Sequence, residues 1–169
     1  MGMSAWAAEM ARYNQWQNEV MYGLMDGLSA EERNAECGLF FDTMQHTLDH
    51  ILMVDLRLLE LVQSGQSPGV PFEPRKIICE NYEDLRVRRR EADRELLALA
   101  GDHNDRWFED LLNLTSPLTG ELRELPRYFY LVQLFNHGTH HRAQVSSELH
   151  RRGIDYGSTD LPMNPYSLY

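Results

Sequence analysis

The chain has 169 residues, of which 43% are hydrophobic and 25% are charged, and its formal net charge is −10. A chain of this length can bury a sizeable core, and we expect residues 1–169 to form a single domain. So acidic a surface repels phosphate backbones and anionic lipid, so binding to nucleic acid or to a membrane surface is not expected. No apolar run approaches the roughly 20 residues that span a bilayer, so a membrane-spanning segment is not expected either.

The first half of the chain predicts two long helices joined by a short helical turn. Apolar residues repeat at helical spacing from about Ser4 to Leu28, and Ser4 is a candidate N-cap. Ser29 and Glu32 have the spacing of a capping box, which predicts a short extra turn. The second long helix is predicted from about Phe40 to Val62. It is apolar over so much of its surface that we expect it to be central, with neighbours on both sides.

A loop and a third helix are predicted next. Residues 64–71 are rich in Gly, Ser and Pro, which is typical of a loop. The third helix is predicted from Pro74 or Arg75 to Ala100. Its basic run at 86–90 lies among acidic residues, so we expect ion pairing on a solvated face rather than phosphate binding.

The last part of the chain predicts an insertion followed by a fourth helix. The segments 107–114 and 119–125 flank Ser116-Pro117-Leu118 and alternate imperfectly, which predicts a short irregular or two-stranded insertion. Pro126 opens the fourth helix, Gly153 is its expected C′ residue, and the remaining tail should pack irregularly over the helices. Four long helices with short connections predict an all-α four-helix bundle.

A histidine-rich stretch, residues 136–142, lies inside the fourth helix. One helical stripe contains two histidines among aliphatic residues: Leu134, His137, His141, Val145 and Leu149. Imidazoles buried there without partners would be costly, and a metal ion shared by both rings removes that cost. The alternative is that each ring donates to a carbonyl or carboxylate and has only a structural role.

A third ligand is expected from another helix, since zinc-like catalytic sites usually have three protein ligands and one open position. His50 lies mid-helix among aliphatic residues and is the first choice, with His46 one turn earlier as its rival. His140 could replace His141, although it lies on a more polar stripe. A di-iron carboxylate site is not expected, because none of the seven histidines has Glu or Asp three residues before it.

Two segments resemble signatures of the DinB/YfiT-like family. Residues 41–55 are similar to its second-helix signature, Thr-Leu-Asn-His followed five residues on by Asp. Residues 136–144 are similar to its fourth-helix signature, Asn-His-x-x-His-His-Arg-Gly-Gln, and residues 13–18 to its first helix. Three positions depart from the pattern: Asp49 stands for Asn, Ala143 for Gly and Leu58 for an aromatic residue.

The resemblance implies an antiparallel bundle of up-down-down-up order that is often a homodimer. It also implies a divalent metal ion, commonly zinc or nickel, bound by His50, His137 and His141. Members with assigned chemistry resemble thiol-S-transferases and thiol-dependent isomerases that use low-molecular-weight thiols such as bacillithiol or mycothiol.

We therefore expect a metal-dependent transferase or hydrolase that acts on a small molecule through a metal-bound thiolate. Four residues near the ligands are candidates to orient them or a substrate, with structural or surface roles as the alternative: Asn136, Arg142, Gln144 and Asp55. The second hypothesis is a non-enzymatic protein, linked to stress or DNA damage, in which the metal is structural or sensory.

Oligomeric state and location are also predicted. Trp6, Trp16 and Trp107 exceed what one bundle core needs, which favours a homodimer. Cys37 and Cys79 match no zinc or redox spacing, and the first residues lack the features of a signal peptide, so a cytoplasmic protein with reduced thiols is expected.

Overall fold

The computed structural model of the protein describes residues 2–115 and 119–169, and that part is predominantly helical. Its four long helices are α1 (Met3–Asp26), α3 (Met44–Ser64), α4 (Tyr82–Asp102) and α6 (Arg127–Arg151). The shorter helices are α2 (Ala30–Asn34), α5 (Asp105–Glu109) and the 3-10 turn η1 (Leu161–Met163). The strands β1 (Leu111–Thr115) and β2 (Leu122–Pro126) form one antiparallel ribbon.

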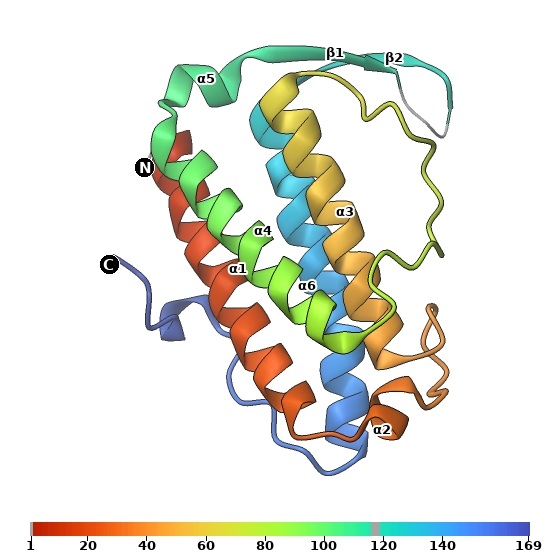
Figure 1. Cartoon of the computed structure of the whole chain (residues 1–169). Coiled ribbons are helices and arrows are strands. Elements are labelled where there is room, and N and C mark those ends of the chain that lie inside the picture. Colours follow the sequence, from red (N-terminus) through yellow and green to blue (C-terminus); the bar gives the residue numbers. More distant parts are fainter. Residues whose placement is uncertain (1, 116–118) are drawn as a thin grey trace.

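The four long helices lie side by side. α3 packs against both α4 and α6, and α1 packs against the same two helices on the other side. α1 and α6 run in one direction and α3 and α4 in the opposite one (Figure 1). Because α3 and α4 are parallel neighbours, the segment 65–81 that joins them must return along the length of α3. In the described part of the chain, no helix is long and apolar enough to cross a membrane.

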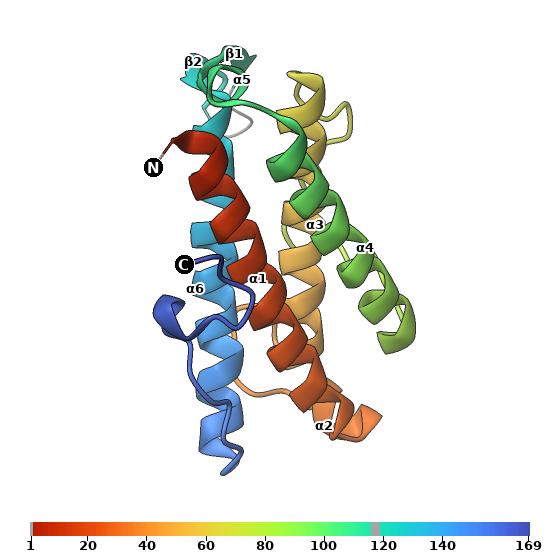
Figure 2. The same ribbon diagram turned by 90° about the vertical axis from the view of Figure 1, so that its left-hand side faces the viewer.

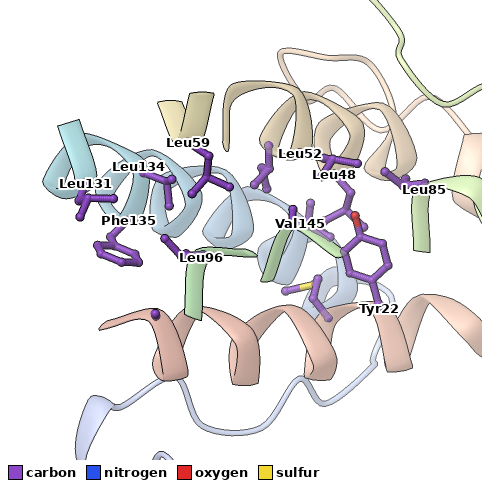
Figure 3. Packing of buried hydrophobic residues seen from close by; sticks show 14 of the residues in the cluster. Tyr22, Leu48, Leu52, Leu59, Leu85, Leu96, Leu131, Leu134, Phe135 and Val145 are labelled. Atoms are coloured by element: carbon purple, nitrogen blue, oxygen red, sulfur yellow. The ribbon is translucent and has the colours of Figure 1, made fainter. Parts of the chain in front are cut away.

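The core is built from the leucine-rich faces of these helices. Figure 3 shows Leu48, Leu52 and Leu59 of α3 opposite Leu134 and Val145 of α6. These five side chains are at most 2% exposed. The second long helix has the expected neighbours, because α3 contacts both α4 and α6, but α1 contacts the same two helices, so α3 is no more central than α1.

Several local predictions are confirmed. Ser29 and Glu32 form a capping box at the start of α2. Gly153 follows α6 with φ +77°, its N–H donates to the carbonyl of His150, and the next N–H donates to that of Leu149. This is the hydrogen-bond pattern of a Schellman motif. The two-stranded insertion is present, with Leu111 paired to Pro126 and Thr115 to Leu122. Ser116, Pro117 and Leu118 lie outside the described residues.

The predicted start of the third helix is wrong. α4 begins at Tyr82, not at Pro74 or Arg75, and Asn81 caps it by accepting from the N–H of Asp84. The preceding residues are held in a non-helical path, because their backbone N–H groups bond to a carboxylate of α3. A tertiary contact therefore overrides the helical period of this segment.

Other boundaries also differ from the predictions. Ser4 is not an N-cap; α1 starts after Gly2, and the Ser4 N–H and hydroxyl both donate to Asp105 at 2.8 and 2.7 Å. α3 begins after Thr43, whose side chain accepts from the His46 N–H. Residues 107–109, expected in the first strand, belong to α5 instead.

The basic run at 86–90 is only partly solvated. Arg86 makes the expected surface ion pairs, with Asp26 and Glu83. Arg89 contradicts the prediction, since it is only 2% exposed and its guanidinium lies between two buried aspartates. The tail after α6 runs beside α1, as expected (Figure 2). The hydroxyl of Tyr13 in α1 donates to the carbonyl of Thr159 in this tail at 2.7 Å.

Candidate metal centre

Three histidines from two helices form a cluster at the boundary between α3 and α6. His50 comes from α3 and His137 and His141 from α6, and one nitrogen from each ring lies within 4.8 Å of the others. The Nε2 atoms of His50 and His137 are 3.1 Å apart. Two imidazole nitrogens that bind one zinc ion at about 2.0–2.1 Å lie within about 4 Å of each other. The cluster therefore fits a divalent ion with a small adjustment of one ring.

The ring of His50 is held by two contacts with residues outside α3. Its Nδ1 donates to the carbonyl of Pro74 at 2.9 Å, so the hydrogen is on Nδ1 and the lone pair is on Nε2. Phe41 stacks on the same ring, with centroids 3.8 Å apart. These two contacts fix the ring plane and turn Nε2 toward the cluster.

The ring of His141 is oriented by a residue of its own helix. Its Nδ1 donates to Oε1 of Gln144 at 2.9 Å, which leaves Nε2 as the free nitrogen. The amide of Gln144 donates in turn to His140, an exposed residue outside the cluster. His46 is also outside the cluster, so the structure brings together the first-choice residues and neither rival.

The three rings are held neutral by their burial. Burial lowers the pKa of His50 to about 4 and that of His137 to about 3, and it also lowers the pKa of His141. Neighbouring histidines contribute to these values for His50 and His137, after burial, the larger cause. Only a neutral imidazole can bind a metal ion, so the site is ready for one at neutral pH.

The second nitrogen of the His137 ring differs from those of His50 and His141, because no side chain or carbonyl of the described residues fixes it. Nδ1 of His137 is buried and makes no hydrogen bond within the described part of the chain. Since Nε2 of the same ring faces His50, an ion shared by the three rings would bind Nε2 and leave Nδ1 without a partner. The donor set, and not this nitrogen, is therefore the observation that agrees with a metal site.

Asp49 positions the loop that holds His50, which the sequence did not predict. Its carboxylate accepts from the N–H groups of Ile78 at 3.0 Å and Cys79 at 2.8 Å, and its side chain is buried. These bonds hold residues 74–79 against α3, where the carbonyl of Pro74 reaches the His50 ring. The only signal in the sequence was that an acidic residue stands where the family pattern has Asn.

Replacing Asp49 with Asn is expected to destabilise the protein by about 1–3 kcal/mol, because an amide has one accepting oxygen for two N–H donors. It should also lower metal affinity by about tenfold or more, since the ring of His50 loses its support. Urea unfolding and zinc titration would measure both effects. Asp102→Asn, an exposed change at the end of α4, should alter neither. Equal effects of the two substitutions would contradict this role for Asp49.

The remaining candidate residues lie in different surroundings. Arg142 points away from the cluster, and its Nη1 donates to the side chains of Asn14 at 2.7 Å and Asn18 at 3.1 Å. Gly138 makes this path possible, because a Cβ there would lie 2.9 Å from Nη1 of Arg142. Asn136 is exposed on α6.

Asp55 is part of a buried ion pair. Its Oδ2 accepts from Nη1 of Arg89 at 2.6 Å, so its partner is neither Arg57 nor a helix end. Among the four candidates, Gln144 is therefore the one whose side chain contacts a histidine of the cluster.

Comparison with known proteins agrees with this arrangement. The chain is 25% identical over 173 residues to Protein DinB of Bacillus subtilis (strain 168), which covers 99% of this chain and 95% of that protein. The sequence model of the DinB family matches residues 3–168. Because that match spans nearly every element described above, the chain belongs to the DinB family.

Proposed function

We propose that the protein is a divalent-metal-dependent enzyme that activates a low-molecular-weight thiol, or water, at His50, His137 and His141. The observation that carries this proposal is the convergence of three neutral imidazoles, two of which have their second nitrogen fixed by a hydrogen bond. Three histidine ligands with an open fourth position are typical of catalytic zinc rather than of structural zinc. The family signature makes zinc or nickel the expected metal.

A divalent ion at this centre would lower the pKa of a bound thiol or water. The protein supplies the remaining requirements. Pro74 and Gln144 hold two of the rings, and Phe41 covers the site with an apolar face, which limits access of water. In a transfer, the thiol would lose its proton to solvent, a carbon–sulfur bond would form, and the leaving group would depart with its electron pair. With water as nucleophile, the same site would catalyse a hydrolysis.

The proposal is tested with untagged protein, loaded with zinc or nickel or treated with a chelator. We expect one divalent ion per chain. Transfer is measured as metal-dependent consumption of a small thiol such as cysteine, with chlorodinitrobenzene as the acceptor. Hydrolysis is measured with a nitrophenyl ester. Chelator and His137→Ala should both abolish turnover. The absence of a stoichiometric ion in protein supplied with zinc and nickel would end the proposal.

A second candidate is a non-enzymatic protein, linked to stress or DNA damage, in which the metal is structural or sensory. It is favoured by the position of the cluster, because an ion there would cross-link α3 to α6. Thermal unfolding with and without chelator separates the two candidates. A large loss of stability at a site closed to small thiols favours the structural role, and a small loss with exchangeable solvent favours catalysis.

The proposal includes an antiparallel four-helix bundle of up-down-down-up order, supported by the directions of the long helices and by the family. It also includes a cytoplasmic homodimer. The reason for expecting a dimer is weaker than the sequence suggested, because Trp6 and Trp107 pack on the core of their own chain.

A further inference from the structure

A large cavity lies between α3, α6, residues 67–72 and the ribbon. Its volume is about 900 Å³, at the upper end of the range of roughly 300–1,000 Å³ that holds small molecules. None of the three histidines lines it. The lining of the cavity begins one helical turn from the histidine cluster, because Val54 follows His50 by four residues and Gln133 precedes His137 by four. Residues four apart share a helix face, so the cavity and the histidine cluster occupy the same side of α3 and α6.

The walls are apolar and aromatic. The lining includes Leu58, Leu125, Phe129 and Tyr130. Phe129 is 48% exposed, although aromatic side chains of this size are usually covered. An apolar, ring-sized body would cover this surface.

The charge of the cavity is opposite to that of the protein. Among the described residues that line it, the charged ones are Arg57 and Arg123, and no carboxylate is present, whereas the whole chain has a net charge of −10. Arg123 is paired with Glu121 at 2.9 Å. This pair leaves Arg57 as the cation of interest.

Arg57 has donors to spare. Its Nη2 donates to the carbonyl of Val70 at 2.9 Å, and its guanidinium lies 5.5 Å from the ring centre of Phe72. Within residues 2–115 and 119–169, no carboxylate oxygen lies within 4.0 Å of the guanidinium nitrogens of Arg57, so Arg57 forms no ion pair there. A guanidinium has five N–H donors in a planar fork that matches carboxylate, sulfonate and phosphate groups.

We propose that this cavity binds an organic anion with an apolar, aromatic-sized body, whose anionic group contacts Arg57 while its other end faces the histidine cluster. The binding claim depends only on the cavity. The further claim that this anion is the small-molecule substrate rests on the proposed function, because it requires chemistry at His50, His137 and His141.

The test uses two fluorescent probes of similar shape, the anion 8-anilinonaphthalene-1-sulfonate and the neutral N-phenyl-1-naphthylamine, titrated into the full-length protein. Arg57→Gln should weaken binding of the sulfonate about tenfold or more, as expected for loss of a charge-assisted hydrogen bond, and should leave the neutral probe unchanged. Arg57→Lys should keep most of the affinity for the sulfonate. Leu58→Trp, which fills the cavity, should weaken both probes.

Arg94→Gln is the matched control, because Arg94 is exposed on α4 and outside the cavity. Equal effects of Arg57→Gln and Arg94→Gln, or equal weakening of both probes by Arg57→Gln, would overturn the proposal. The titrations are repeated in chelator and with His137→Ala, where the selectivity for the anion should persist. Selective binding without metal uptake would reject the proposed function alone, and metal-dependent turnover without selective binding would reject this inference alone.

Discussion

Replacing His137 with Ala is expected to lower the affinity for a divalent ion by at least about 100-fold. Loss of a residue that only supports a ligand costs about 10–100-fold in metal affinity, and loss of a ligand should cost no less. Nε2 of His137 lies 3.1 Å from Nε2 of His50, so both atoms can reach one ion. Without it, the ion would have two protein ligands in place of three.

Zinc titration by calorimetry and the metal content after dialysis would measure this loss. His140→Ala and His46→Ala are matched controls, because both histidines lie close in sequence to the cluster and outside it. A loss in His140→Ala as large as that in His137→Ala would contradict the assignment of the ligands.

The same substitution should remove the effect of metal on stability. An ion at 1,000 times its dissociation constant stabilises the native state by about 4 kcal/mol if it does not bind the unfolded chain. Zinc should therefore raise the melting temperature of the wild type and of His140→Ala, and leave that of His137→Ala unchanged. A similar rise in all three would indicate a site elsewhere.

Much of the fold could be predicted because local patterns determine it. The apolar repeats of the long helices, the capping box at Ser29 and the helix stop at Gly153 each depend on neighbours a few residues away. The residues of the cluster could be selected for a similar reason. A histidine on an aliphatic stripe, such as His141, has to face the interior of a helical protein.

The errors arise where distant parts of the chain meet. Ser4 lies inside α1 and does not cap it, and Asp105, more than 100 residues later, accepts the Ser4 N–H in place of a local cap. α4 starts late because Asp49 holds the N–H groups of Ile78 and Cys79. Arg89 looked solvated among charged neighbours, and only the packing of four helices shows that it is enclosed. No local period contains this information.

Replacing Arg89 with Met is expected to destabilise the protein by about 3–5 kcal/mol, because it leaves buried carboxylates without their cation. Nη1 of Arg89 lies 2.6 Å from Asp55 and Nη2 lies 2.9 Å from Asp93, and the three side chains are at most 5% exposed. Burial raises the pKa of Asp55 to about 6 even beside the guanidinium, which opposes the rise. Without Arg89, we expect this carboxyl to take up a proton at neutral pH.

The pair belongs to a network that joins all four long helices. Asp93 of α4 accepts from Asn18 of α1 at 2.9 Å. Asn14 and Asn18 accept in turn from Arg142 of α6. Asp55 of α3 completes the connection through Arg89. Two arginines and two aspartates balance in charge, so removal of any one of them leaves the others uncompensated in the interior.

Urea unfolding would measure the loss, with Arg94→Met as the matched control on the exposed face of α4. The control should change the free energy of unfolding by less than about 0.5 kcal/mol. The double variant Asp55→Leu/Arg89→Met should recover part of the loss, because a carboxylate and its cation leave the interior together. A cost for Arg89→Met no larger than for Arg94→Met would show that the pair contributes nothing to stability. Arg142 of this network is next to His141, so the zinc affinity of the same variants is also measured. If the double variant recovers stability but not zinc affinity, the network also positions the ligands of α6.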